Sequence, residues 1–377
     1  MPQEVEISGA GPSGLAAAIT LAKAGWRVRL YERNQDVGWR FQGDFQGLEN
    51  WTEQHDVLEE FRTLGIAPTF EYRPFRRAVL FDPDHRECRC RSDRPLFYLV
   101  RRGREAGTLD SALKAQALDA GVDIRFGTAA RHLPQGGIIA EGPRAADAIA
   151  VGYLFDTDHA DGAWGIVSED MAPKGYAYLL VWQGRGTLAT CMFRDFHREK
   201  EYLKRSVEFF RSTVGVDMNN ARPFGGAGNF ALPRTATRDR LLLIGEAAGF
   251  QDMLWGFGMR YAILSGHLAA RAWIEGNPSL YDALWRQRFG GLLRSGFVNR
   301  MFYNRLGNWG YRRMVAQIGR RADAGLWLNS YYRPRPWKTV LSALTRRWMR
   351  LRGPQDPGRE GCDCTWCRCQ HECSPLI

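Results

Sequence analysis

The sequence has no apolar run long enough to span a bilayer, nothing at its N-terminus resembles a signal peptide, and it has no internal repeat. These absences argue against an integral membrane protein, a secreted protein and a solenoid. With 377 residues, 45% of them hydrophobic and 25% charged, the composition is typical of a globular protein with one large or two interlocked domains. The expected location is the cytoplasm.

Cysteine is scarce in the body of the chain and crowded at its end. Only Cys88, Cys90 and Cys191 precede the C-terminal tail. The other five cysteines lie close together in the tail, with His371 among them. Their closeness predicts a soft tetrahedral metal site, for which zinc or copper fits the spacing better than an iron–sulfur cluster. Reversible thiol–disulfide chemistry and a passive tail are the alternatives. The candidate metal ligands are Cys362, Cys364, Cys367, Cys369 and Cys373.

Acidic residues are almost absent from the segment 311–352, which has ten Arg, one Lys and the single acid Asp323. This segment therefore carries nearly all of the net charge of +11. Its last part, after Pro336, has helical periodicity, with an apolar stripe and arginines mostly elsewhere. That pattern predicts either a helix at the inner face of a membrane or a helix packed on the body with a solvated basic face. Nucleic-acid binding is less favoured because no recognised binding module accompanies the charge. The stripe comprises Trp337, Val340, Leu341, Leu344, Trp348 and Leu351.

A glycine-rich turn lies near the start of the chain. Residues 4–8 are typical of a strand, 15–24 of an Ala-rich helix, and 26–32 of a second strand that ends at Glu32. Gly9 suits the tight turn, Gly11 the approach of a pyrophosphate, and Gly14 the close packing of helix on strand. The free N–H groups of the helix start favour phosphate, and Glu32 is placed to bind a ribose. The motif, which includes Pro12 and Ser13, predicts a dinucleotide site.

The rest of the chain predicts the fold class. Residues 148–193 form short β-rich runs, typical of an antiparallel sheet, and the apolar strand 241–245 returns the chain to the nucleotide sheet. We therefore predict an α/β protein with a doubly wound, Rossmann-like domain, an inserted antiparallel substrate domain and a helical C-terminus. The predicted divisions are a first nucleotide-domain part at 1–150, a substrate domain at 151–234, a return segment at 235–275, a basic helical region at 276–352 and a Cys-rich tail at 353–377.

A second glycine-rich segment follows the apolar strand, from Gly245 and Glu246 to Gly266. Together with residues 9–14 and Glu32, and with the segment 98–110, it resembles the FAD-binding pattern of the para-hydroxybenzoate-hydroxylase-type flavoproteins. Within that superfamily the chain resembles the geranylgeranyl reductase-like group. A second nucleotide loop at 225–230 is the weaker interpretation, because it opens no clean helix, so no dedicated nicotinamide domain is expected.

The resemblance implies roles for individual residues. The glycines of the first turn would hold the FAD pyrophosphate, and Arg101 or Arg102 would lie along the phosphate and ribityl side. Glu246 stands where the family usually has Asp, and Glu141-Gly142 where it has Asp-Gly. Further candidate cofactor-binding residues, several placed near the isoalloxazine by the resemblance, are Arg33, Arg40, Gly245, Gly256, Gly258 and Met259.

The function expected from this resemblance is hydride transfer through a flavin to a hydrophobic, isoprenoid-type substrate. The substrate would lie between the flavin and the sheet that carries Tyr176 and Tyr178, with NAD(P)H or a redox protein as the electron donor. A flavin monooxygenase of the same superfamily is one alternative. Another is an electron-relay protein in which the metal-bearing tail exchanges electrons with FAD. No residue can be named as a proton donor.

Overall fold

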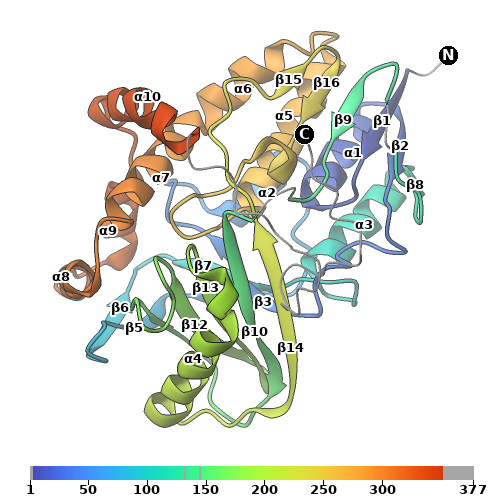
Figure 1. Cartoon of the computed structure of the whole chain (residues 1–377). Helices are drawn as coiled ribbons and strands as arrows, with labels where there is room; N and C mark the ends of the chain where they lie inside the picture. The colour runs from blue at the N-terminus through green and yellow to red at the C-terminus, as the bar shows by residue number, and fades with distance from the viewer. Residues whose placement is uncertain (1–2, 131–132, 144–145, 351–377) are drawn as a thin grey trace.

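The structure is a computed structural model and describes residues 3–130, 133–143 and 146–350, except the side chains of 346–350. Two large sheets, one in the upper and one in the lower part of Figure 1, organise these residues. Helices α8, α9 and α10 lie along one side of the molecule. Within this part of the chain, no helix combines the length and the apolar character that crossing a bilayer requires.

The first sheet has six strands in the order β15-β16-β9-β1-β2-β8. All of its pairings are parallel except that between β15 and β16. The chain reaches the sheet at residue 4, leaves it between β2 and β8 and again after β9, and returns at residue 237. This course confirms the predicted doubly wound fold with an inserted antiparallel domain. The strands are β1 (Glu4–Ser8), β2 (Arg27–Tyr31), β8 (Asp123–Arg125), β9 (Gly137–Ile139), β15 (Thr237–Arg238) and β16 (Leu241–Leu243).

Helices pack around this sheet and share its core. Helix α1 crosses α5 so closely that a Cβ on Gly266 would lie 2.2 Å from the Ser13 carbonyl oxygen. The buried guanidinium of Arg260 on α5 bonds to Glu60 and Thr52, which holds α5 to the segment around α2. The helices of this region are α1 (Pro12–Lys23), α2 (Val57–Thr63), α3 (Leu109–Asp119), α5 (Met259–Ile274) and α6 (Leu280–Arg288), with the 3₁₀ turn η2 (Gly245–Ala248).

The second sheet has seven strands in the order β14-β10-β13-β12-β11-β5-β6. The predicted runs in residues 148–193 form its antiparallel centre. Residues 77–91 add two more strands to this sheet. Strand β5 pairs in parallel with β11, and β6 pairs with β5 in the antiparallel direction. The glycines of residues 225–228 belong to the edge strand β14 rather than to a nucleotide loop. The strands are β5 (Arg77–Phe81), β6 (Glu87–Arg91), β10 (Ala148–Asp156), β11 (Gly162–Ile166), β12 (Tyr176–Trp182), β13 (Arg185–Met192) and β14 (Asn219–Gly228).

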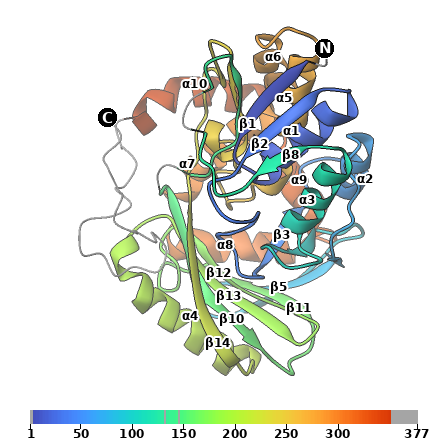
Figure 2. The ribbon, with the colours of Figure 1, turned by 90° about the vertical axis from the view of Figure 1, so that its right-hand side faces the viewer.

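The two faces of the second sheet are covered differently. Helix α4 (Glu199–Val214), with the short turn η1 (Phe196–Arg198), lies along one side, as Figure 2 shows, and its aromatic side chains join the core there. The other side packs on a three-stranded sheet through Phe45, Leu99 and Trp182. That small sheet consists of β3 (Phe45–Glu49), β4 (Tyr72–Phe75) and β7 (Phe97–Arg101).

The C-terminal part of the described chain is helical, as predicted. Helix α8 lies against β6, and α10 lies against α7. Helices α7, α8 and α9 share a core of Tyr303, Tyr311 and Tyr332 with the segment around Trp51. The helices are α7 (Gly290–Tyr303), α8 (Asn308–Gly319), α9 (Ala324–Tyr332) and α10 (Pro336–Arg350).

Candidate cofactor and substrate site

A cavity of about 770 Å³ lies between the two large sheets. It begins at the turn between β1 and α1 and extends to helices α8 and α9. Its wall contains residues from many segments between Ser8 and Leu328, and these segments come together only when the chain is folded. Of the predicted cofactor-binding residues, those on the wall are Gly9, Gly11, Pro12, Ser13, Glu32, Arg33, Arg40, Glu246, Gly256, Gly258 and Met259.

The three glycines of the first turn differ in their surroundings. Gly9 has a φ of +102°, and a Cβ there would lie 2.5 Å from the Ala140 carbonyl oxygen. A Cβ on Gly14 would lie 1.9 Å from the carbonyl oxygen of Gly9, so this glycine permits the close packing of α1 on the turn. A Cβ on Gly11 would meet nothing within 4 Å. The wall is therefore open at Gly11, where the helix begins with free N–H groups.

Glu32 ends β2 beside this turn. One of its carboxylate oxygens accepts a hydrogen bond from the Ala10 N–H at 2.9 Å, and the other accepts two from Asn34, at 2.9 and 2.7 Å. The carboxylate is 9% exposed and lies on the cavity wall. It therefore fixes the glycine turn from a position on the cavity wall.

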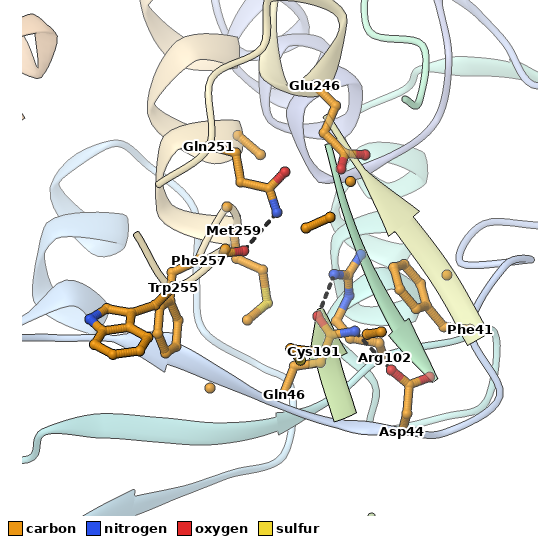
Figure 3. Close-up of a pocket in the computed structure, with 18 of the residues that line it drawn as sticks. Phe41, Asp44, Gln46, Arg102, Cys191, Glu246, Gln251, Trp255, Phe257 and Met259 are labelled. Carbon is orange, nitrogen blue, oxygen red and sulfur yellow. Dashed lines mark hydrogen bonds between the residues drawn. The ribbon is translucent and has the colours of Figure 1, made fainter. Parts of the chain in front are cut away.

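Arg40 and Glu246 form an ion pair across the cavity wall, with 2.9 Å between Nη2 and Oε2. Glu246 comes from η2 and Arg40 from the loop after β2, so the pair joins that loop to the second glycine-rich segment. Gly245 lies behind this wall, where a Cβ would lie 2.6 Å from the Ser13 hydroxyl oxygen. Figure 3 shows Glu246 and Arg102 on opposite sides of the same space.

Arg102, and not Arg101, faces the cavity. Its guanidinium forms two hydrogen bonds of 2.9 Å with the Asp110 carboxylate and lies 4.0 Å from the centre of the Phe41 ring. Arg101 instead pairs with Glu71 and Glu105 outside the cavity. Neighbouring residues of a strand point to opposite sides, which explains why two adjacent arginines have different surroundings.

The loop between η2 and α5 contributes Gln251, Trp255, Gly256 and Phe257 to the wall. The Gln251 amide donates to the Gly256 carbonyl oxygen at 2.6 Å, and this contact holds the turn before α5 (Figure 3). The Tyr176 hydroxyl of β12 donates to the Trp255 carbonyl oxygen at 2.6 Å. This hydrogen bond joins the second sheet to the loop between η2 and α5.

Burial sets the charge state of the sheet side of the cavity. It raises the pKa of Tyr176 and of Tyr178 well above the ordinary value, and it raises the pKa of the Cys191 thiol to about 12. All three are therefore neutral at physiological pH. This wall offers hydroxyl and thiol groups but no charge.

The far end of the cavity is apolar and contains residues for which no role was predicted. We call it the apolar chamber. Helices α8 and α9 close it opposite β5 and β6. Their apolar residues have the spacing of any core-facing helix, so the sequence contains no sign that these helices line a cavity. Its wall consists of Trp51, Leu80, Cys90, Leu96, Phe97, Val167, Tyr176, Trp255, Phe257, Met314, Ile318, Ala324, Trp327 and Leu328.

The predicted metal ligands of the tail lie outside the described residues. Among the residues that the structure does describe, no group of three or more His, Cys, Asp or Glu side chains is placed to hold a metal. The metal site at Cys362, Cys364, Cys367, Cys369 and Cys373 stays a prediction.

The mostly parallel sheet, the glycine turn and Glu32 at the end of β2 define a Rossmann-type dinucleotide-binding domain. The seven-stranded sheet forms a second, mainly antiparallel domain. Residues 7–56 match the family model of the NAD(P)-binding Rossmann-like domain. The chain is 22% identical to a digeranylgeranylglycerophospholipid reductase of Methanocaldococcus jannaschii, over 85% of this chain and 91% of the relative. A reductase of the same name from Methanosphaerula palustris is 24% identical, over 75% of this chain and 81% of the relative.

Solved structures share this fold. A geranylgeranyl bacteriochlorophyll reductase-like protein of Thermoplasma acidophilum superposes with a TM-score of 0.70 at 17% identity, over 93% of this chain and all of that one. A p-nitrophenol 4-monooxygenase of Pseudomonas putida superposes with a TM-score of 0.62 at 14% identity, over 94% and 99%. The chain is homologous to the digeranylgeranylglycerophospholipid reductases, and the resemblance found in its motifs is confirmed.

Proposed function

We propose that the protein is an FAD-dependent oxidoreductase that reduces a hydrophobic, isoprenoid-type substrate. The observation that carries the proposal is the continuity of one cavity from the glycine turn to the apolar chamber. A dinucleotide could lie at the first end and a hydrophobic acceptor at the second, so that the flavin ring and the substrate meet between them.

The residues present fit FAD. The open space at Gly11 and the N–H groups of α1 suit a pyrophosphate, and the carboxylate of Glu32 suits the adenosine ribose. Arg40, Arg102 and Glu246 would line the ribityl side, and the turn at Gly256 and Gly258 would approach the isoalloxazine. Bound FAD would supply hydride transfer, while the chain would orient the substrate and exclude water.

The composition of the apolar chamber supports a hydrophobic acceptor. None of its side chains carries a charge, and the Tyr176 hydroxyl is already bonded to the loop. A charged substrate would lose its solvation there and meet no charged side chain on the wall in compensation. The relatives named for reduction of digeranylgeranylglycerophospholipid make such a lipid the first substrate to test.

The test is to purify the full chain, record its visible spectrum and identify the released cofactor. The enzyme would then be reduced without oxygen and mixed with digeranylgeranylglycerophospholipid in detergent. We expect yellow protein that contains FAD and a saturated lipid product. A colourless protein that does not bind FAD would refute the proposal. Oxygen uptake that matches a hydroxylated product would favour the monooxygenase alternative.

Peripheral contact with an anionic membrane surface is part of this proposal. Helix α10 buries Lys338 and Ser342, which are 4% and 2% exposed, and turns Trp337, Val340 and Leu344 outward with exposed fractions of 48%, 60% and 70%. The Phe302 ring of α7, 46% exposed, lies 6.2 Å from that of Trp337. We call these four exposed side chains the outer apolar face.

Basic residues accompany the outer apolar face. Arg305 and Arg335 are exposed next to its two helices in the sequence, and the segment from residue 311 onward is strongly basic. An apolar face with Trp that is followed and preceded in the sequence by exposed arginines suits the headgroup region of an anionic bilayer. Such a surface would also be the source of a lipid substrate.

A further inference from the structure

The loop from Phe250 to Gly258 has two sides with different neighbours. Gln251, Trp255 and Phe257 line the cavity. Asp252, Met253 and Leu254 turn the other way and are 4%, 2% and 0% exposed. The loop has no strand or helix of its own, so contacts behind it must determine the position of the side that faces the cavity.

Asp252 bonds the loop to α9. One carboxylate oxygen accepts hydrogen bonds from the Trp255 N–H and from the Tyr332 hydroxyl, both at 2.8 Å. The other oxygen accepts the Leu254 N–H at 3.2 Å. Tyr332 is 1% exposed, so this contact is shielded from water. A single buried carboxylate therefore shapes the loop and attaches it to the last turn of α9.

Arg300 of α7 bonds the loop to the second sheet. Its guanidinium donates to the Met253 carbonyl oxygen at 2.7 Å and also to that of Leu254. A further N–H donates to the Lys174 carbonyl oxygen at 2.6 Å, in the turn that precedes β12. The group is 5% exposed and lies 3.6 Å from the centre of the Phe193 ring. Three main-chain carbonyls from two segments thus share one buried cation.

Helix α9 connects this anchor to the apolar chamber. Trp327 and Leu328 lie on the chamber wall, and the Asn329 amide donates to the Trp51 carbonyl oxygen at 2.9 Å. Tyr332 follows one turn later on the same helix. Helix α9 therefore contributes both to the chamber wall and to the anchor of the loop.

We propose that Asp252, Tyr332 and Arg300 are positioning residues for the flavin site. They hold the Gly256–Gly258 turn at the place where it would meet the isoalloxazine, and they connect that turn to the wall of the apolar chamber. This inference rests on the proposed function, because it concerns the same cavity. None of the three side chains lies on the cavity wall, so they act through the loop rather than on the substrate.

Tyr332→Phe is the sharpest test, since it removes one oxygen atom and leaves the ring packing intact. We expect FAD binding by the apoprotein to weaken by about tenfold, because the carboxylate loses a buried donor and the loop is less ordered. The visible circular dichroism of the bound flavin should also change. Arg300→Gln should act in the same direction, and Arg300→Lys should restore part of the affinity because it keeps the charge.

Tyr281→Phe is the matched control. Tyr281 is equally buried and its hydroxyl also donates one hydrogen bond, to the Leu243 carbonyl oxygen of β16 at 3.0 Å rather than to the loop. It should lower the Tm without changing the affinity for FAD. If Tyr332→Phe and Tyr281→Phe have the same affinity and the same flavin dichroism, the positioning role is refuted. Failure of the wild-type protein to bind FAD would instead refute the proposed function.

Discussion

The glycines of the first turn permit an experiment at the scale of single residues. Gly11 has a φ of −75° and open space where a Cβ would lie, so Gly11→Ala should leave the Tm of the apoprotein unchanged. If a pyrophosphate approaches the backbone there, the added methyl should raise the Kd for FAD by about tenfold or more. A tenfold change in Kd corresponds to ~1.4 kcal/mol of binding free energy. Thermal unfolding and FAD titration of the same sample measure both effects.

Gly14→Ala is the contrasting change. Its Cβ would lie 1.9 Å from the Gly9 carbonyl oxygen, so we expect a loss of about 1–3 kcal/mol in the free energy of unfolding of the apoprotein. A Gly11→Ala protein that binds FAD as tightly as the wild type would show that no phosphate lies against this turn.

His267 predicts a pH dependence of stability. It lies between α5 and α1, with its Nδ1 atom 3.2 Å from the Thr20 hydroxyl oxygen. Burial, helped by the charge of Arg271, lowers its pKa to about 4 from 6.5. Between these pH values the unfolded chain binds a proton that the folded protein does not, so stability falls as the pH drops below about 6.5 and the loss is complete near pH 4.

The magnitude for His267 is about 1–2 kcal/mol between pH 7 and pH 5, allowing for its partial exposure. The experiment is urea unfolding at both pH values for the wild type and for His267→Gln. The wild type should lose this much more stability than the variant. Equal losses in the two proteins would show that His267 is protonated as readily in the folded state as in the unfolded chain.

At the scale of elements, α9 offers two leucines for comparison. Leu328 lies on the wall of the apolar chamber, whereas Leu326 on the same helix is 72% exposed. Leu328→Ala should raise the KM for digeranylgeranylglycerophospholipid in detergent by roughly three- to tenfold, because apolar contact with the chain is lost. Reduction of the bound flavin by dithionite should not change. Leu326→Ala should leave both quantities as they are, and an equal KM in the two variants would exclude α9 from substrate binding.

Elements built from neighbouring residues could be predicted from sequence, and those built from distant pairing could not. The first βαβ unit follows from alternation, helical period and glycine spacing within thirty residues. The entry of β5 and β6 into the second sheet depends on pairing such as Val79 with Trp164, which no local pattern contains. The apolar faces of α8 and α9 could be recognised as buried, but not as the wall of a cavity.

Residue-level choices show the same limit. The arginine pair at 101 and 102 indicated a cofactor contact, but only the register of β7 decides which of the two points inward. The period of residues 337–352 predicted an amphipathic helix, but not which side it turns to the body. The structure buries Lys338 and leaves Trp337 exposed, because the side of α10 that packs on α7 contains Lys338, Leu341 and Ser342.

At the scale of the whole molecule, this orientation of α10 has an energetic consequence. Burial lowers the pKa of Lys338 to about 8, with the nearby charge of Arg335 adding to the effect, and the Lys338 ammonium donates to the Tyr331 carbonyl oxygen. The helix thus buries a cation while large apolar side chains stay in water. Such an arrangement is stabilised when another surface covers the outer apolar face. The proposed cover is an anionic bilayer.

Vesicle sedimentation tests this proposal on the full chain. We expect binding to vesicles that contain phosphatidylglycerol, weaker binding to pure phosphatidylcholine, and a decrease with added salt because the arginines contribute by charge. Replacing Trp337, Val340 and Leu344 together by Ser should weaken binding by about tenfold or more without lowering the Tm, since these side chains are exposed.

Leu118→Ser is the matched control, because Leu118 is 50% exposed on α3, on a helix of the nucleotide-binding region. It should bind vesicles as the wild type does. If the triple variant binds equally well and remains sensitive to salt, charge alone holds the protein to the lipid and the outer apolar face has another role. If neither protein binds at low salt, the membrane part of the proposal fails, while the redox chemistry of the cavity remains to be judged from its own cofactor and substrate experiments.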